Sequence, residues 1–248
     1  MRFTCEKSML VTGLNIAGRT VAQKSSLPVI EGILCRAEVG LSLTGYNMET
    51  AITYDIEADV SDAGECILPA KLFGDIVRRL PEGPVTVVVG EDYKVSIRAG
   101  YASFTISAES AEDYPELPNV NSGRPVMLPQ NQLKNLISGT IFAVSENQGR
   151  PIHTGGKFEV TNDSITTIAV DGFRLARRTY HPEEGTGREM SFVVPSPGLK
   201  EVEKIVSDVE DMASFTLGPK HILFQVGKAT LVCRLLEGEF LDWRRVLP

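Results

Sequence analysis

The chain lacks the features that mark membrane-bound and secreted proteins. Its 248 residues contain no apolar run close to the roughly 20 residues that a membrane-spanning helix needs. The first residues, Met1 to Lys7, alternate apolar and polar side chains and contain no long apolar segment of the kind found in secretion signals. We therefore expect a cytoplasmic protein without membrane partners.

Cysteine is scarce, and its spacing argues against a zinc site. The four cysteines are far apart, and no pair of them has the spacing of metal ligands; they are Cys5, Cys35, Cys66 and Cys233. Each lies in or beside an apolar, strand-like run, so we expect four buried, reduced thiols. We expect no metal and no cofactor.

Signatures of catalysis are missing as well. The three histidines, His153, His181 and His221, fall in a turn, a loop and a strand edge without an accompanying nucleophile motif. The carboxylates are scattered and form no cluster that could hold catalytic metal ions. Asp171 and Asp242 stand in turn-like contexts, where Asp commonly caps backbone N–H groups. An enzyme is therefore not expected.

One glycine motif has the spacing of a phosphate-binding loop. It runs from Gly13 to Thr20, but Arg19 stands where that motif requires Lys. The motif also lies within an amphipathic helix, where its N–H groups cannot turn toward a phosphate. We interpret this stretch as part of the helix.

What the chain does contain is a repeat. Each half runs through a strand, a helix, several strands, a strand ending in proline, a second helix and three more strands, and the two halves keep this order at a spacing of about 125 residues. The pattern predicts an α+β protein of two duplicated domains, 1–120 and 121–248, each with two helices packed on antiparallel sheets. The helices are expected at Lys7 to Ala22, Ala70 to Leu80, Gln130 to Val144 and Pro197 to Val209.

The apolar spacing also predicts which side chains face the core. Leu72 and Phe73 are expected on the buried face of the second helix, and Val209 on that of the fourth. Turns are expected near Gly40 and at Gly45 to Asn47. Gly100 and Gly227 occupy matching turns in the two halves.

Basic side chains recur on the polar faces of the four helices, although the formal net charge of the chain is −7. If the duplicated domains place these helices on one side, the cations form a surface suited to DNA phosphates without base reading. Separate solvated helix faces are the alternative. Few aromatic residues lie among the cations, which argues against stacking of single-stranded bases. The cations are Arg19, Lys71, Arg78, Arg79, Lys134, Lys200 and Lys204.

Five sequence motifs together resemble the bacterial DNA polymerase III β subunit family, the sliding clamps. They are Ser26-Leu27-Pro28, Leu43-Thr44-Gly45, Leu80-Pro81-Glu82-Gly83, Asp171-Gly172-Phe173-Arg174-Leu175-Ala176, and Asp242 with Arg244-Arg245-Val246-Leu247-Pro248. The resemblance covers the whole chain and corresponds to the first two of the family's three domains. In the absence of the third domain, we expect that the chain alone does not close the family's ring.

The resemblance implies a processivity factor for DNA replication. In that family a ring-shaped homodimer encircles double-stranded DNA, independently of sequence, and tethers the polymerase. The helix cations would then line the hole of the ring. The resemblance adds Lys24 and Arg150, from two loops, to the residues that face DNA.

The resemblance also implies a pocket for partner peptides. Its partners would be the polymerase III catalytic subunit, the clamp loader and other proteins with a clamp-binding motif. Val170 stands where the family usually has Thr, and Leu241 and Trp243 replace the usual Pro and Tyr, which we expect to reshape the rim. The wall in this chain would comprise His153, Val170, Gly172, Phe173, Arg174, Leu175, Leu241, Arg245 and Val246.

Two other classes of function make different demands on the sequence. A nuclease or polymerase would need clustered carboxylates for metal ions, and the chain shows none. A protein-interaction scaffold of clamp fold without a DNA role is the alternative to the clamp hypothesis, and it would be favoured if the helix cations were scattered.

Overall fold

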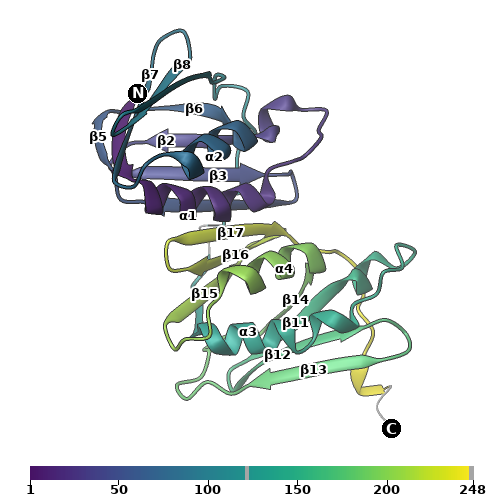
Figure 1. Ribbon diagram of the computed structural model, residues 1–248. Coiled ribbons are helices and arrows are strands. Elements are labelled where there is room, and N and C mark those ends of the chain that lie inside the picture. The colour runs from purple at the N-terminus through teal and green to yellow at the C-terminus, as the bar shows by residue number, and fades with distance from the viewer. Residues whose placement is uncertain (121–122, 246–248) are drawn as a thin grey trace. The chain divides into compact units, whose positions relative to one another are not determined.

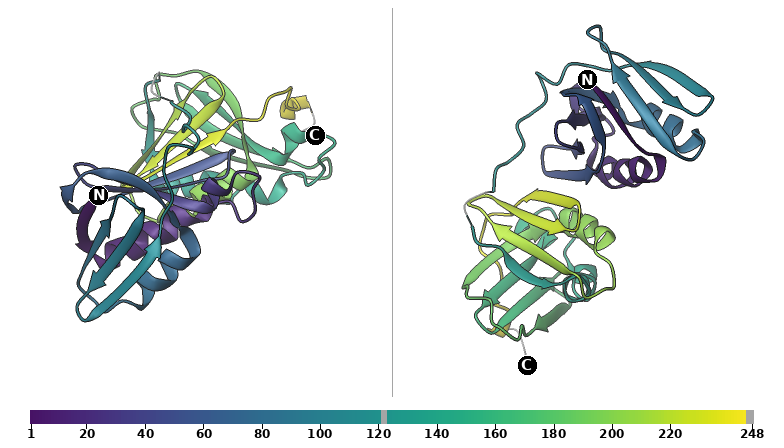
Figure 2. Two further views of the ribbon diagram at one scale, coloured as in Figure 1. Left: turned by 90° about the horizontal axis from the view of Figure 1, so that it is seen from above. Right: turned by 90° about the vertical axis from the view of Figure 1, so that its left-hand side faces the viewer.

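The computed structural model describes residues 1–120 and 123–245, which form two compact units (Figure 1). The first unit covers Met1–Leu117 together with Lys228–Thr230, and the second begins at Pro118. In each unit two α-helices pack against each other and against antiparallel strands (Figure 2). The predicted α+β class is therefore confirmed. No helix among the described residues is long and apolar enough to cross a membrane.

The first unit contains α1 (Lys7–Ala17) and α2 (Ala70–Arg79), with short 3₁₀ turns η1 (Gly18–Thr20) and η2 (Pro28–Glu31). Its strands pair in the orders β5-β1-β7-β8-β9 and β4-β3-β2-β6. The strands are β1 (Arg2–Glu6), β2 (Gly32–Ala37), β3 (Leu41–Tyr46), β4 (Thr50–Ile56), β5 (Asp59–Asp62), β6 (Gly64–Pro69), β7 (Pro84–Val89), β8 (Lys94–Ala99) and β9 (Ala102–Ser107).

The second unit repeats this plan with α3 (Gln130–Ser138) and α4 (Ser196–Ile205). Its strands pair in the orders β13-β12-β11-β14 and β10-β15-β16-β17. The strands are β10 (Val126–Pro129), β11 (Gly155–Thr161), β12 (Ser164–Val170), β13 (Leu175–Tyr180), β14 (Met190–Pro195), β15 (Met212–Leu217), β16 (His221–Val226) and β17 (Ala229–Arg234), and the 3₁₀ turns are η3 (Ile141–Ala143), η4 (Pro151–Thr154) and η5 (Trp243–Arg245).

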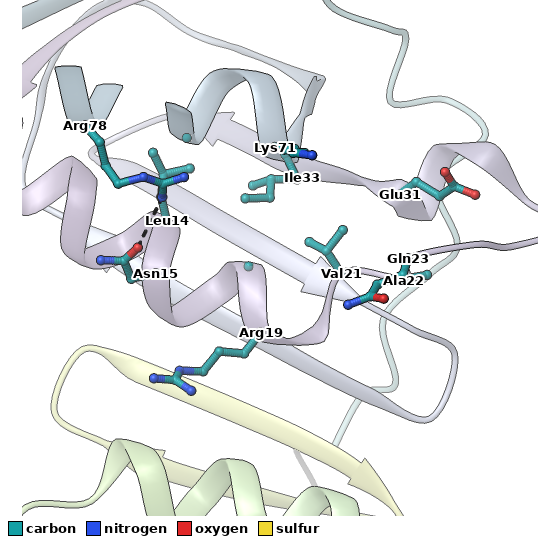
Figure 3. A pocket seen from close by; sticks show the side chains of 13 residues that line it. Leu14, Asn15, Arg19, Val21, Ala22, Gln23, Glu31, Ile33, Lys71 and Arg78 are labelled. Carbon is teal, nitrogen blue, oxygen red and sulfur yellow. Dashed lines mark hydrogen bonds between the residues drawn. The ribbon is translucent and has the colours of Figure 1, made fainter. Parts of the chain in front are cut away.

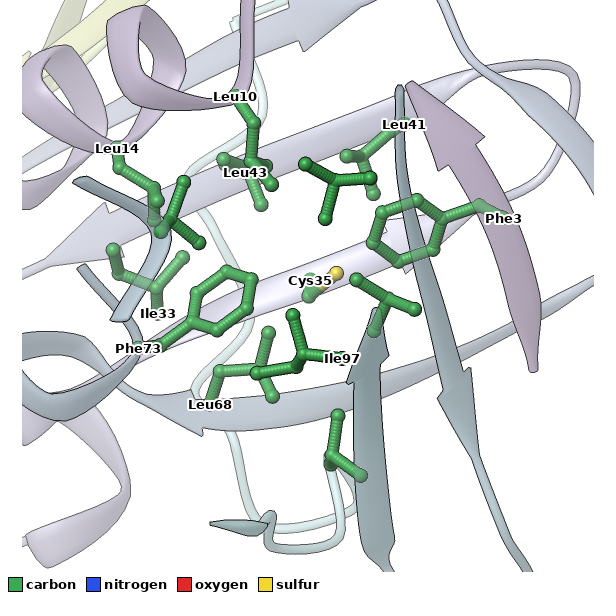
Figure 4. Packing of buried hydrophobic residues seen from close by; sticks show 14 of the residues in the cluster. Phe3, Leu10, Leu14, Ile33, Cys35, Leu41, Leu43, Leu68, Phe73 and Ile97 are labelled. Atoms are coloured by element: carbon green, nitrogen blue, oxygen red, sulfur yellow. The ribbon is translucent and has the colours of Figure 1, made fainter. Parts of the chain in front are cut away.

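Each unit has an apolar core between its helices and sheets. In the first unit Phe3 and Phe73 are fully buried and lie on either side of Cys35 (Figure 4). In the second unit Phe158 stacks on Phe192, with ring centroids 5.3 Å apart, and Phe215 meets both rings edge-on. Such pairs add to the stabilisation that comes from burying apolar area.

The prediction of four buried, reduced cysteines is confirmed. All four thiols are free and buried. Burial raises the pKa of Cys5 to about 12. Cys35 and Cys66 face each other across β2 and β6 as partners in the antiparallel register. Because a protonated thiol is a weak nucleophile, Cys5 acts as a small apolar group in the core.

The first and third helices, α1 and α3, are shorter than the sequence predicts. Both end at a 3₁₀ turn that a threonine side chain stabilises. The chain tightens into a 3₁₀ turn after Ala17 and again shortly after Ser138. Thr20 donates its hydroxyl to the carbonyl oxygens of Ala17 and Gly45, at 3.3 and 2.9 Å. Thr140 donates to the carbonyl oxygens of Leu136 and Ile137 in the same way. The apolar spacing continues through these turns, so periodicity alone did not detect the helix ends.

The fourth helix ends at Ile205, not at Val209. Beyond it, the N–H of Ser207 donates to the side-chain carbonyl of Gln130 at 3.0 Å, and the N–H of Asn131 donates to the carbonyl of Val209 at 3.0 Å. These bonds tie the non-helical chain after Ile205 to the start of α3. Val209 is consequently 41% exposed, and the prediction that it is buried was wrong.

Two further sequence predictions in the first unit were wrong. Leu72 is 49% exposed, because the buried stripe of α2 runs through Phe73 and Val77. Gly45 lies inside β3, and the turn comes after it, where the side chain of Asn47 accepts the N–H groups of Glu49 and Thr50. Gly45 is required in the strand because a Cβ atom there would overlap the carbonyl oxygen of Ala17.

We expect Gly45→Ala to destabilise the chain by about 3 kcal/mol, because either α1 or β3 must shift to admit the new methyl group. Gly18→Ala is the matched control, since nothing lies within 4 Å of a Cβ atom there and its φ of −62° suits any residue. Its unfolding free energy should change by less than about 1 kcal/mol. Urea unfolding of both variants measures the difference, and equal stabilities would contradict the close approach of α1 to β3.

Candidate nucleic-acid face and partner pocket

Cations of the first unit surround a groove between its two helices. The groove has a volume of about 1000 Å³. Leu14 and Ile33 form apolar parts of its lining, while Arg19, Lys71 and Arg78 contribute positive charge (Figure 3). All three cations are exposed, because the helices bury their opposite faces against the sheets. The result is a polar groove open to an anionic ligand.

The charges of α2 are only partly balanced. Arg78 bonds to Asp75 at 2.7 Å and to the side chain of Asn15 at 3.5 Å, and the bond from Arg78 lowers the pKa of Asp75. Among the described residues, neither Lys71 nor Arg79 has a carboxylate within ion-pair distance. The exposed face of α2 therefore carries a net positive charge.

The second unit places its predicted cations differently. Lys200 and Lys204 are exposed on α4, and Lys134 is half-buried on α3. Lys204 bonds to Glu201 at 2.6 Å, which reduces the net charge at that position. Of the two cations in loops, Lys24 is exposed between η1 and η2, whereas Arg150 lies at the start of η4 and lines a different hollow.

The predicted partner pocket is divided between two hollows. Hollow A has a volume of about 470 Å³ and contains three predicted wall residues, His153, Leu241 and Arg245. The ring of His153 meets that of Phe240 at 80°, with centroids 5.1 Å apart. Leu241 is 40% exposed, so an apolar anchor is available at this rim. The complete lining is Arg150, Ile152, His153, Glu239, Phe240, Leu241, Asp242 and Arg245.

Hollow B has a volume of about 820 Å³ and contains Phe173 and Arg174, together with Phe142, Pro197 and Lys200. Phe173 is fully exposed. The guanidinium of Arg174 lies 5.8 Å from the ring centroid of Phe142, within the range of a cation–π contact. Sequence reasoning missed Phe142, because the apolar residues on both sides of it are typical of a buried segment.

A carboxylate fixes the turn that carries Phe173 and Arg174 in hollow B. Asp171 accepts the N–H groups of Phe173 and Arg174, both at 3.0 Å, and the side chain of Arg174 at 2.8 Å. These bonds lower the pKa of Asp171, the backbone bond from Phe173 contributing most. Gly172, with φ of 92°, supplies the left-handed conformation of the turn. Asp242 likewise accepts the N–H of Arg244, so the predicted capping role of both aspartates is confirmed.

Two further predicted wall residues, Val170 and Leu175, are buried and partly buried, respectively. Val170 is 4% exposed and belongs to an apolar cluster with Phe240 and Trp243, against which Leu175 packs. Val246 lies outside the described residues.

His153 is kept neutral by its surroundings. Burial lowers its pKa, and the nearby positive charge of Arg150 lowers it further. Its Nε2 atom is buried without a hydrogen-bond partner in the part of the chain that the structure describes. At neutral pH hollow A therefore combines an uncharged imidazole ring with two arginines and two carboxylates, of which Asp242 forms an ion pair with Arg245 at 3.1 Å.

Sequence reasoning missed the group that holds the rim of hollow A. Trp243 is 6% exposed, and its indole N–H reaches both carboxylate oxygens of Glu159 at 3.3 Å. Lys157 and Arg244 bond to the same carboxylate at 2.8 and 2.9 Å. A signal was available: Lys157 and Glu159 alternate with the buried Phe158 along β11, which places a charged pair on one strand face.

The side chains that could bind metal ions are dispersed. Within residues 1–120 and 123–245, no three His, Cys, Asp or Glu side chains gather in a way that could hold a metal ion. The site geometry instead offers two kinds of surface, a set of exposed helix cations and a pair of partly apolar hollows.

Family models match most of the chain. Residues 1–118 match the model of the DNA polymerase III beta subunit, N-terminal domain, and residues 127–242 match that of its central domain. The chain is 30% identical to the beta sliding clamp of Bacillus subtilis and 32% identical to that of Staphylococcus aureus. In both comparisons all of the chain aligns with 68% of the relative.

Solved structures give the same result. The sliding clamp of Bacillus subtilis superimposes with a TM-score of 0.96 at 30% identity, covering all of this chain and 68% of the clamp. A putative DNA polymerase III beta subunit from Eubacterium rectale superimposes with a TM-score of 0.94 at 30% identity, covering 99% of this chain and 67% of that one.

The cations around Glu159 make the stability of the chain depend on pH. Burial alone would raise the pKa of Glu159, but bonds from Lys157 and Arg244 lower it below its usual 4.5. The carboxylate therefore stabilises the fold above about pH 4.5, and this contribution is lost as the pH falls through the lower, folded-state pKa. The stability difference between the unmodified chain and Glu159→Gln should shrink below that pH.

Thermal unfolding measures this difference. The experiment covers about pH 3 to 7, a range that includes the titration of a Glu side chain. Glu183→Gln is the matched control, because Glu183 is exposed and has no bonded partner among the described residues. It should follow the unmodified chain at every pH. A constant gap between Glu159→Gln and the unmodified chain would refute the charged contact.

Proposed function

Because the chain belongs to the DNA polymerase III beta subunit family, we propose that its helix cations face duplex DNA and that its two hollows receive partner peptides. The chain has the function of a sliding clamp, a processivity factor in replication and not a catalytic subunit. The helix cations and the two hollows are the parts of the chain to which we assign this function.

The distribution of charge on the helices supports a DNA-facing role. The chain has 32 acidic and 25 basic residues, yet α1 and α3 contain no Asp or Glu. Lys71, Arg79 and Lys200 are exposed on the helices without a carboxylate partner among the described residues. Helix cations held at the surface attract phosphates of any sequence, which is what a protein that slides along DNA requires.

We propose that the full-length protein acts as a ring-shaped homodimer. The closed ring would keep the protein on DNA, and the positive charges would only centre the duplex within it. An exposed sheet edge supports assembly with a second copy. β9 is the outermost strand of its sheet, and Phe104 on this strand and Tyr101 beside it are 40% and 95% exposed. Such an edge offers both unpaired backbone groups and apolar area to another chain.

The hollows suit short peptides with apolar anchors. Leu241 and Phe240 offer apolar area in hollow A, with Arg150 and Arg245 at its rim. A Leu or Phe anchor that is fully buried gains roughly 1.5–3 kcal/mol. Two such anchors give a modest affinity, which allows partners to exchange. We propose that these partners are the polymerase III catalytic subunit, the clamp loader and other proteins with a clamp-binding motif.

Replacing Lys71, Arg79 and Lys200 by Ala should weaken binding to duplex DNA of any sequence. The salt dependence should also become shallower, by roughly 0.9 in the slope of log K against log salt for each phosphate that the protein no longer neutralises. The charge-matched control replaces Arg98, Lys220 and Arg234, which are exposed on strands or strand turns. An equal loss of affinity in both variants would favour scattered charge and a scaffold without a DNA role.

Leu241→Ala should weaken a short peptide with adjacent Leu and Phe anchors by about tenfold, because one apolar contact at the rim of hollow A is removed. Val39→Ala is the control, since Val39 is a fully exposed aliphatic side chain of the first unit. Titration calorimetry measures both affinities. If the two variants bind the peptide equally well, hollow A is not its site.

A further inference from the structure

The segment Phe240–Arg245 forms one side of hollow A, and a single side chain anchors it. Leu241 and Arg245 both line the hollow. Leu241 is 40% exposed, and the side chain of Arg245 is 85% exposed. Between them, Trp243 turns inward and is only 6% exposed. It packs in the apolar cluster with Ile168 and Val193. The direction of the exposed rim side chains therefore depends on how firmly Trp243 is held.

Trp243 is held from three sides. Its N–H donates to both oxygens of Glu159 on β11. The guanidinium carbons of Arg177, on β13, and Arg244 lie 4.6 and 4.4 Å from its ring centroid. Cations at such distances attract the faces of an indole ring, most strongly where water is excluded.

Among the described residues, Glu159 is the only carboxylate that bonds to the side chains of Lys157, Trp243 and Arg244, and it faces three cations. Lys157 and Arg244 bond to it directly, and Arg177 lies across the indole. Its side chain is 16% exposed, so solvent screens these contacts weakly. Removal of its charge would leave Lys157, Arg177 and Arg244 to repel one another around Trp243.

Neither Glu159 nor Trp243 lines hollow A. A partner that occupies the hollow therefore meets Leu241 and Arg245, which flank the anchored tryptophan in sequence. We propose that Glu159 and Trp243 form a latch that positions the Phe240–Arg245 rim, and that the closed latch sets the affinity of hollow A for a partner peptide. This inference rests on the proposed function of hollow A, and it makes Glu159 and Trp243 positioning residues.

The latch has its own spectroscopic signal, because Trp243 is the only tryptophan in the chain. In the unmodified chain its emission should be that of a buried indole and resist quenching by acrylamide. Glu159→Gln should shift the emission to longer wavelength and increase quenching, while Glu183→Gln should change neither.

The affinity test uses the 248-residue chain and a short peptide with adjacent Leu and Phe anchors. Glu159→Gln should weaken binding about tenfold, and Trp243→Phe, which keeps a ring but loses the N–H, should weaken it similarly. Combining the two should add little, because both remove the same contact. A control arm places Glu159→Gln in a Leu241→Ala, Arg245→Ala background, where its effect should fall below about twofold.

The outcomes separate the latch from the function of the pocket. The latch would be overturned if Glu159→Gln left the peptide affinity unchanged. It would also be overturned if the loss of affinity in Glu159→Gln were as large in the Leu241→Ala, Arg245→Ala background as in the unmodified chain. A loss of thermal stability without a loss of affinity would indicate a merely structural contact. If the unmodified chain binds no peptide, the proposed function of hollow A is wrong. The latch can still be tested in that case, because unchanged Trp243 emission in Glu159→Gln would overturn it.

Discussion

Burial of one apolar stripe on each helix decides where the charges of this protein can lie. α1 and α2 place Leu14, Phe73 and Val77 against the sheets, and α4 does the same with Leu199 and Val202. Because a helix has only one such stripe, its cations are left on the opposite face. An acidic protein can thus present exposed positive charge on its helices without any special arrangement of its surface.

This constraint explains why the fold class could be predicted from sequence. The alternation in strands such as Lys94–Ala99 and the helical spacing around Phe73 arise from the same one-sided burial that the structure shows. Helix ends were harder to predict, since they depend on contacts across the chain. The hydroxyl of Thr20 bonds to Gly45, and Ser207 bonds to Gln130. Neither contact can be detected in the spacing of apolar residues along the sequence.

The site was predictable in part for a similar reason. Motif resemblance placed His153, Arg174 and Leu241 in one wall. It could not show that they line separate hollows, because the lining of a hollow depends on the tertiary structure. Glu159 was missed because its role comes from tertiary partners. The alternation along the strand predicts that the side chain of Glu159 faces away from the core. It does not predict that the indole of Trp243 lies next to that side chain.

The paired threonine caps have a consequence for how each unit sets the length of its first helix. Thr20 and Thr140 end equivalent helices in the two units with the same hydroxyl bond to the carbonyl three residues earlier. Each hydroxyl takes up a carbonyl group of the last helical turn, where carbonyl groups have no partner within the helix. One side chain in each unit thus ends the helix, although the apolar spacing of the sequence continues beyond it.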